Sequence, residues 1–310
     1  MRGIVIGIVA GIVAAAASGE APAQLGERER TAVLLAAYGV VPNVTYTTQS
    51  NTDLKLDLYL PPRGNGAPPS PTVIVIHGGG WVAGAKEQSQ LEVLPYLAMG
   101  WAAVNVEYRL AKSALAPAAV EDCRCALRWV LRNAGRYGFD TNRLVVTGGS
   151  AGGHLALITG MLPASAGLDR ECATSDEVGW ADAGSQGEMR VAAIVNWFGI
   201  TDVPAMLAGA ETHGYAVQWF ASLPNREEVA RRVSPLTYVR VGLPPVFTVH
   251  GDRDALVPYA QAQRLHAALT RAGVPNRLFT IPGGGHGGFT VEQMTTAFAA
   301  IKEFLSVHVR

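Results

Sequence analysis

A serine lies within a glycine-rich segment that joins an apolar run to a helical pattern. The run Leu144–Thr147 leads into Gly148-Gly149-Ser150-Ala151-Gly152-Gly153, which contains the pattern G-x-S-x-G. A turn this sharp leaves no room for side chains at the flanking glycines, and it lifts the Ser150 hydroxyl above a sheet. The first amides of the following helix then point at whatever the serine attacks. The segment predicts a nucleophilic serine, and a glycine-rich turn that only binds an anion is the alternative.

A serine hydroxyl needs a base to take its proton and a group that orients the base. His286 stands between glycines after the apolar run Leu278–Ile281, and both Asp252 and Asp254 follow the run Val246–His250. The order Ser, Asp, His on the ends of successive strands is one of the known orders of a catalytic triad. We expect His286 to be the base and Asp254 the acid, since Asp252 follows its strand so closely that it would cap the turn.

A third glycine segment can supply amide donors for a developing oxyanion. The run Thr72–His77 ends in Gly78-Gly79-Gly80-Trp81, and backbone amides free of side-chain cover suit this task. We expect the oxyanion hole to consist of the amides of Gly79, Gly80 and Ala151, with His77 bracing the loop. A phosphate-binding loop is the rival interpretation, but no Gly-Lys-Ser/Thr follows these glycines.

Aromatic side chains near the predicted strand ends are candidates for substrate binding. We expect Trp81, Phe198 and Trp219 to line the cleft, where they would suit an aromatic or sugar-linked group, and core packing is the alternative for such residues. No His or Cys pair has the spacing of a zinc site, so the prediction includes no metal and no organic cofactor.

The elements that must position these residues follow a regular alternation. Strand-length apolar runs are separated by helical patterns, and strands buried on both faces indicate a mostly parallel sheet with helices on both sides. Ligands of such sheets bind beyond the carboxyl ends of the strands. A hairpin precedes the alternation at Val44–Thr48 and Leu54–Leu60. The six runs are Thr72–His77, Ala102–Tyr108, Leu144–Thr147, Val191–Phe198, Val246–His250 and Leu278–Ile281.

Two long, turn-rich stretches interrupt the alternation. They are Pro163–Arg190 and Thr201–Arg232, and we expect them to be lid-like insertions after the fifth and sixth strands rather than separate domains. The expected helical patterns are Glu27–Tyr38, Gln88–Met99, Ala118–Tyr137, Ala151–Met161, Tyr259–Ala272 and Val291–Val307.

The segments His77–Trp81, Gly148–Gly153, His250–Pro258 and Gly285–Gly287 resemble the α/β-hydrolase superfamily. The resemblance is greatest to exported esterases related to hormone-sensitive lipase and to bacterial feruloyl and acetylxylan esterases. It implies an α/β-hydrolase fold and a secreted serine carboxylesterase that hydrolyses short-chain, aromatic (feruloyl-type) or sugar-linked esters. It also implies the roles assigned above to Ser150, Asp254, His286 and the oxyanion amides. The short segment before Leu54 favours an open site over that of a long-acyl lipase.

Two other classes of function share this pattern. A serine peptidase or amidase of the prolyl-oligopeptidase kind has the same residue order, although no propeller precedes the catalytic segment here. A non-catalytic binding protein with a hydrolase fold is the second alternative, but such proteins typically lack a triad member.

The composition narrows the range of partners. The 310 residues include 25 basic and 25 acidic side chains, so the formal charge is zero and the basic surplus of a nucleic-acid-binding protein is absent. A hydrophobic fraction of 49% excludes a disordered chain. The expected partner is a small-molecule or polysaccharide-linked ester, and the oligomeric state is left open.

The first residues have the features of an export signal. Met1-Arg2 precedes the uncharged run Gly3–Ala17, and Ala21-Pro22-Ala23 has the small residues that a signal peptidase requires. We expect a signal peptide at 1–23, a single catalytic domain at 24–310, and a secreted or periplasmic protein without a membrane span. An uncleaved anchor is the alternative, but the run is shorter than the roughly 20 residues that span a bilayer.

Export also affects how the three cysteines are interpreted. In an oxidising compartment Cys172 can bridge to Cys123 or to Cys125, and the remaining thiol is expected to be buried.

Overall fold

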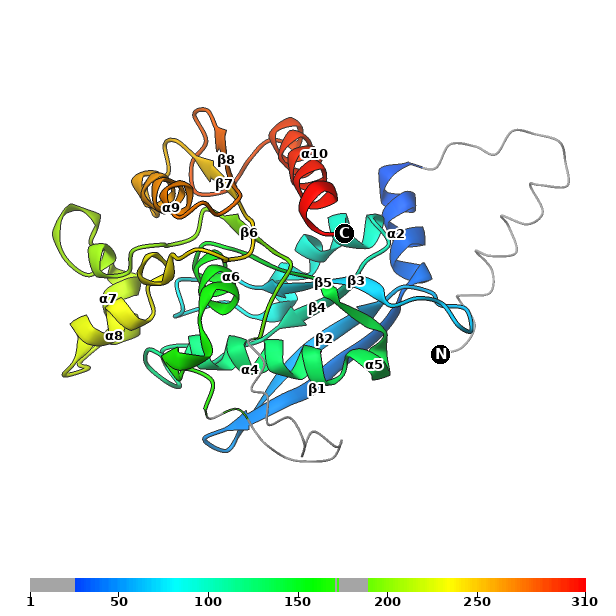
Figure 1. Ribbon diagram of the computed structural model, residues 1–310, viewed down its shortest axis with the longest axis horizontal. Coiled ribbons are helices and arrows are strands. Elements are labelled where there is room, and N and C mark those ends of the chain that lie inside the picture. The colour runs from blue at the N-terminus through cyan, green and yellow to red at the C-terminus, as the bar shows by residue number, and fades with distance from the viewer. Residues whose placement is uncertain (1–25, 171, 173–188) are drawn as a thin grey trace, which may run out of the picture. The chain divides into compact units, whose positions relative to one another are not determined.

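The computed structural model describes residues 26–170, 172 and 189–310 (Figure 1). The predicted signal peptide and most of the first predicted insertion lie outside these residues. The chain divides into two units, residues 1–37 and 38–310. The first contributes helix α2 (Glu27–Ala37), and the second contains the sheet. The single catalytic domain at 24–310 stays a prediction.

The second unit is built on a sheet whose eight described strands follow the order β1-β2-β4-β3-β5-β6-β7-β8. β2 runs antiparallel to both of its neighbours, and the strands from β3 to β8 are parallel to one another. The predicted α/β-hydrolase fold with a mostly parallel sheet is therefore confirmed. The strands are β1 (Gly39–Gln49), β2 (Thr52–Leu60), β3 (Ser70–Ile76), β4 (Ala102–Val106), β5 (Phe139–Gly149), β6 (Ala193–Trp197), β7 (Val246–Gly251) and β8 (Asn276–Ile281).

The predicted hairpin is formed by β1 and β2. Ser50 and Asn51 join the two strands with φ values of 48° and 64°. A two-residue turn with positive φ at both positions matches the right-handed twist of paired strands, which explains why the hairpin closes at this point.

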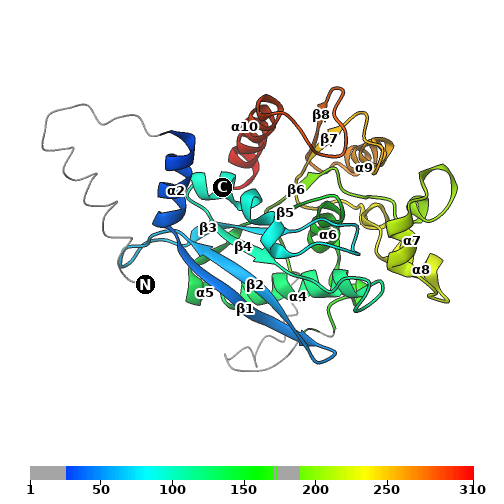
Figure 2. The same ribbon diagram turned by 180° about the vertical axis from the view of Figure 1, so that it is seen from behind.

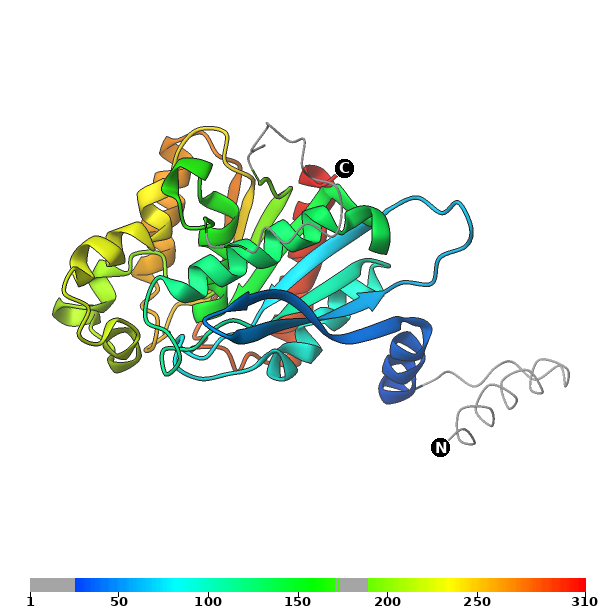
Figure 3. The ribbon, with the colours of Figure 1, turned by 90° about the horizontal axis from the view of Figure 1, so that it is seen from below.

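Helices cover both faces of the sheet. Figure 3 shows α4 (Ala118–Arg132) and α5 (Ala134–Tyr137) in front of the strands and α10 (Val291–His308) behind them. Two predicted helices are divided in the structure. Asn133 separates α4 from α5, and the expected helix at 88–99 is a 3₁₀ segment, η1 (Lys86–Val93), followed by α3 (Leu94–Ala98). Pro95 lies in the first turn of α3, where its missing amide donor is not needed.

The second insertion is a group of short helices that stands out at one side of the sheet, on the left in Figure 1 and on the right in Figure 2. It connects β6 to β7 and so lies in the chain where it was predicted. Its helices are η3 (Pro204–Met206), η4 (Gly209–Glu211), α7 (Gly214–Phe220), α8 (Arg226–Arg232) and η5 (Pro235–Tyr238). Of the first insertion, the structure describes η2 (Ala164–Ala166).

The remaining helices follow strands that carry site residues. α6 (Ala151–Met161) follows β5 directly, and α9 (Ala260–Arg271) follows β7 and leads to β8. Across the described ranges, no helix is both long enough and apolar enough to cross a membrane.

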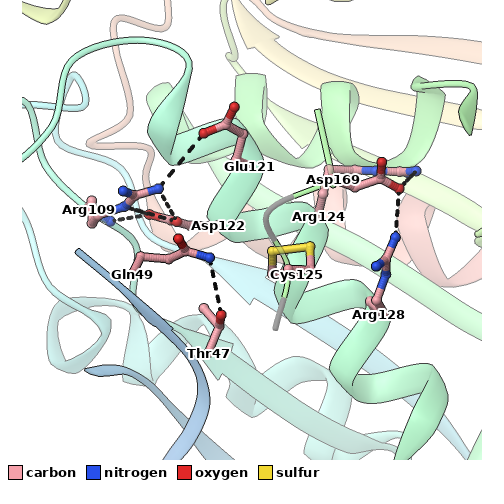
Figure 4. The surroundings of a disulfide bond; sticks show 10 residues. Thr47, Gln49, Arg109, Glu121, Asp122, Arg124, Cys125, Arg128 and Asp169 are labelled. Carbon is pink, nitrogen blue, oxygen red and sulfur yellow. Dashed lines mark hydrogen bonds and ion pairs between the residues drawn. A yellow bond between two sulfur atoms is a disulfide. The ribbon is translucent and has the colours of Figure 1, made fainter. Parts of the chain in front are cut away.

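A disulfide joins Cys125 of α4 to Cys172, and Cys123 is a buried free thiol. The prediction that Cys172 pairs with one of these two cysteines is confirmed, and so is the buried third thiol. Residues two positions apart in a helix point to different sides, so Cys125 faces Cys172 and Cys123 does not. Asp169 of that segment contacts Arg128 at 3.1 Å (Figure 4). The contact holds Asp169 against α4 near the disulfide.

Candidate active site

Ser150 occupies a strained turn between β5 and α6. Its φ and ψ are 57° and −121°, a conformation that residues other than glycine rarely adopt. A Cβ at Gly148 would lie 2.4 Å from the Ile76 carbonyl oxygen, and one at Gly152 would lie 2.1 Å from the same atom. Only glycines allow the turn to approach β3 this closely, which is the nucleophile elbow expected from the sequence.

The three predicted catalytic side chains form one hydrogen-bonded row. The Ser150 hydroxyl donates to His286 Nε2 over 2.8 Å, and His286 Nδ1 donates to Asp254 Oδ2 over 2.7 Å. The sheet order places β5, β7 and β8 so that residues 150, 254 and 286, far apart in the chain, meet at one edge. This is the arrangement in which a histidine can take a proton from a serine.

Asp254 is buried and remains ionised because it is surrounded by donors. Burial opposes the charged form of this carboxyl, but hydrogen bonds from His250, His286 and the Val257 amide outweigh burial and hold its pKa well below the ordinary value. Oδ1 accepts from the amides of Leu256 and Val257 at 2.8 and 2.9 Å. Both carboxylate oxygens are therefore fixed, and the ring of His286 is oriented.

Asp252, the alternative acid, serves a different purpose. Its carboxylate accepts a hydrogen bond from the Gly283 amide at 2.6 Å and so ties the end of β7 to the turn after β8. The structure brings Asp254 rather than Asp252 to His286, as the sequence predicted.

The glycine loop after β3 lines the catalytic pocket together with Ser150. Gly79 and Gly80 have φ values of 112° and 61°. A Cβ at Gly79 would lie 2.0 Å from the Ala83 carbonyl oxygen, and one at Gly80 would lie 2.9 Å from Tyr215 Cβ. In the part of the chain that the structure describes, the backbone amides of Gly79, Gly80 and Ala151 donate to no backbone oxygen. These amides are available to an oxyanion.

His77 braces this loop, as expected. Its ring stacks on Tyr108 with the ring centroids 4.1 Å apart, and Nδ1 donates to the Gly78 carbonyl at 2.8 Å. The Tyr108 hydroxyl donates to the His77 carbonyl at 3.0 Å. These contacts fix the loop in place, so its amides need no rearrangement when negative charge develops on the carbonyl oxygen of the substrate.

Two adjoining cavities lie at this end of the sheet, and one of them opens at Ser150 and His286. The catalytic pocket, about 440 Å³, contains Ser150 and His286 together with Gly78, Gly79, Gly80, Glu92, Gly149, Phe198, Tyr215 and Leu256. The side cavity, about 360 Å³, shares Glu92, Gly149 and Phe198 with it. Its other walls are mostly apolar and are formed by Leu91, Pro95, Tyr96, Thr147, Trp197, Gly287, Gly288, Phe289, Met294 and Phe298.

One of the three predicted substrate-binding aromatics lies at the site. Phe198 lines both cavities, and its ring meets that of His286 edge-on at a centroid distance of 4.8 Å. The expectation for Trp81 and Trp219 is wrong, because both are fully buried and neither lines the catalytic pocket or the side cavity. The two indoles stack at 4.2 Å, and Trp81 Nε1 donates to His154. Burying two large rings against each other is more favourable than exposing them.

Several wall residues were not anticipated from the sequence. Leu256 and Phe289 are close in the chain to Asp254 and His286, and this adjacency was an available signal. Glu92 and Tyr215 belong to η1 and α7, where nothing in the local sequence marks them. Only the packing of these helices against the strand ends reveals them.

Comparison with known proteins places this geometry in a family. The family model BD-FAE matches residues 56–269, so the chain belongs to the BD-FAE family. Esterase LipC of Mycobacterium tuberculosis is 30% identical over 230 residues, which make up 71% of this chain and 53% of LipC. The chain spans about half the length of the curated relatives it matches.

Solved structures agree with the family. A truncated carbohydrate esterase from gut microbiota has a TM-score of 0.70 and 28% identity, and the match covers 88% of this chain and 97% of that one. Thermogutta terrifontis Est2 in its butyrate-bound form has a TM-score of 0.71 and 25% identity, with coverage of 88% and 94%. All three of these proteins are named as esterases, and the fold is that of the α/β-hydrolase type.

Proposed function

We propose that this protein is a serine carboxylesterase that works through an acyl-enzyme intermediate. The observation that carries the proposal is the continuous hydrogen-bonded row from Asp254 through His286 to Ser150. Family membership and the names of the relatives support the same reaction class.

In the first half of the reaction Ser150 Oγ bonds to the ester carbonyl carbon while its proton passes to His286 Nε2. The carbonyl oxygen becomes an oxyanion held by the amides of Gly79, Gly80 and Ala151. The bond to the alcohol oxygen then breaks, and His286 returns the proton to the departing alcohol. In the second half, water takes the place of the alcohol and releases the acid. Asp254 stabilises the charged imidazole in both halves.

We propose short-chain, aromatic (feruloyl-type) or sugar-linked esters as the substrates. Est2 with bound butyrate and the carbohydrate esterase are relatives whose descriptions agree with this range. The side cavity also suits an aromatic ring. Its apolar walls can pack against the ring, and the buried hydroxyls of Tyr96 and Thr147 can bond to polar groups on it. Neither hydroxyl makes a hydrogen bond of normal geometry to a described residue. Comparing acetyl, butyryl and feruloyl esters tests the range, and a strong preference for long acyl chains would contradict it.

We further propose that the mature protein is secreted or periplasmic. The apolar run at 3–17 with its small-residue site supports export, and the disulfide between Cys125 and Cys172 suits an oxidising compartment. Amino-terminal sequencing of the protein from its native host tests the proposal, and a protein that begins at Met1 would contradict cleavage after Ala23.

The decisive experiment replaces the nucleophile. Ser150→Ala is expected to fold normally and to lose nearly all hydrolysis of p-nitrophenyl acetate, and it should no longer react with a fluorophosphonate probe. Ser306→Ala, at an exposed position of α10, is the matched control and should retain both properties. Substantial hydrolysis by pure Ser150→Ala would remove Ser150 as the nucleophile. A wild-type protein inert to probe and ester would favour the binding-protein alternative, and faster cleavage of a matched amide than of its ester would favour the peptidase alternative.

A further inference from the structure

Glu92 is a carboxylate placed where the two cavities meet. It is on the wall of both the catalytic pocket and the side cavity, near the end of η1. An ester that reaches Ser150 with one substituent in the side cavity must pass this side chain. Its position therefore gives it access to the substrate without a part in the triad.

Glu92 is also the single acidic residue among the described lining of either cavity. The other walls are apolar or uncharged, apart from the catalytic His286. Among the described residues, Glu92 makes no hydrogen bond and no ion pair. By contrast Glu87, on the same 3₁₀ segment, pairs with Lys86 at 2.6 Å. An unpaired carboxylate beside an apolar cavity is available to a charge on the substrate.

The surroundings of Glu92 shift the pH at which its carboxylate ionises. The side chain of Glu92 is exposed at the mouth of the cavities. The protein packed on its other sides still disfavours the charged form and raises its pKa to about 7, and the attraction of His77 opposes this only in part. The titratable groups that face it are His77 in the glycine loop, Tyr96 in α3 and His286 across the pocket. Glu92 is therefore neutral in part of its population at neutral pH and becomes mostly ionised in mildly alkaline solution.

We propose that Glu92 sets the charge selectivity of the site, favouring esters whose substituent carries an ammonium group and rejecting those whose substituent carries a carboxylate. The inference rests on the proposed esterase function and names a residue that selects among its substrates. Selection by repulsion of the wrong charge complements attraction of the right one. A unit charge several ångströms away in a partly hydrated cleft changes kcat/KM by about tenfold.

The test uses three 4-nitrophenyl esters of equal acyl length that end in a methyl, a trimethylammonium or a carboxylate group. A second set places the same three groups on the alcohol of an acetate ester. Above about pH 8 the wild-type kcat/KM should follow the order cation, neutral, anion in at least one set, with about tenfold between steps. The order should weaken near about pH 6, where Glu92 is protonated.

Variants of η1 separate this role from a structural one. Glu92→Gln should bring the cation-to-anion ratio close to one, Glu92→Asp should restore part of it, and Glu87→Gln should leave it as in the wild type. The cation-to-anion ratio of kcat/KM does not depend on overall activity, so it can be measured even in a variant that has lost part of its activity. No discrimination in either set, or discrimination that persists in Glu92→Gln, would overturn the proposal. Failure of the esterase function itself would appear instead as loss of hydrolysis of all the esters.

Discussion

Asp254 illustrates how a single carboxylate sets the state of the whole triad. Its two oxygens accept hydrogen bonds from two backbone amides and from His286, and the side chain is out of contact with water. Asp254 therefore keeps its charge, and it holds the proton of His286 on Nδ1 so that Nε2 can accept a proton from Ser150.

Asp254→Asn is expected to lower kcat by about 10⁴-fold, because the amide no longer selects the productive tautomer of His286. Steady-state hydrolysis of p-nitrophenyl acetate measures the loss. Asp252→Asn is the control, since that carboxylate contacts the Gly283 amide, and it should keep a kcat close to that of the wild type. A larger loss in Asp252→Asn would reverse the assignment of the acid.

The low pKa of Asp254 predicts the direction of its effect on acid stability. A carboxyl whose pKa is lower in the folded than in the unfolded chain adds stability above its unfolded pKa of about 4, and this stability is lost as the pH falls toward the folded pKa. The free energy of unfolding of the wild type should therefore decrease more steeply from about pH 5 to about pH 3 than that of Asp254→Asn. Urea unfolding at each pH measures this, and equal slopes would show that Asp254 is not stabilised in its charged form.

At the scale of elements, the turn from β5 into α6 depends on how closely it approaches β3. Gly148 and Gly152 lie against the Ile76 carbonyl with no space for a methyl group. The same closeness aims the Ala151 amide and the Ser150 hydroxyl at one point above the strand ends.

Gly152→Ala is expected to lower the free energy of unfolding by about 3 kcal/mol or more, because the new Cβ would overlap backbone atoms that cannot move freely. Activity should fall with it, since the turn must widen. Gly135→Ala in α5 is the matched control, because no atom lies within 4 Å of its added Cβ, and its stability should be unchanged or slightly raised. Urea unfolding and ester hydrolysis report both effects, and a stable, active Gly152→Ala would refute the steric argument.

At the scale of the whole molecule, the disulfide joins parts of the chain that are 47 residues apart. Closing a loop of that length lowers the conformational entropy of the unfolded chain, which stabilises the folded state by about 4 kcal/mol in the chain-entropy model.

Cys172→Ser should therefore lower the free energy of unfolding by about 4 kcal/mol in an oxidised preparation, whereas the same change under reducing conditions should have little effect. Cys123→Ala controls for the loss of a buried thiol outside the disulfide. Alkylation of the denatured, unreduced protein, followed by mass analysis, should modify one cysteine. Three modified cysteines would contradict the bridge.

Much of the fold could be predicted from local patterns. Buried strands and intervening helices have distinct periodicities, so the order of elements followed from the sequence, and the splits at Asn133 and near Pro95 concern helix ends, where neighbouring packing competes with propensity. The first disulfide partner, Cys172, was predicted, but the choice between Cys123 and Cys125 required the orientation of α4.

Local sequence was enough to single out the residues that need a special backbone or a special chemistry: Ser150 between its glycines, His286, Asp254 and the glycines after β3. Such positions tolerate few residue types, and they adjoin strand ends whose places in the sheet follow a rule. The residues of the cavity walls, in contrast, became known only from the folded chain. Trp81 and Trp219 have the composition of a binding site yet stack inside the core, while Glu92, which no motif marks, faces both cavities. Burial depends on which surfaces meet after the chain has folded, and a linear pattern does not contain that information.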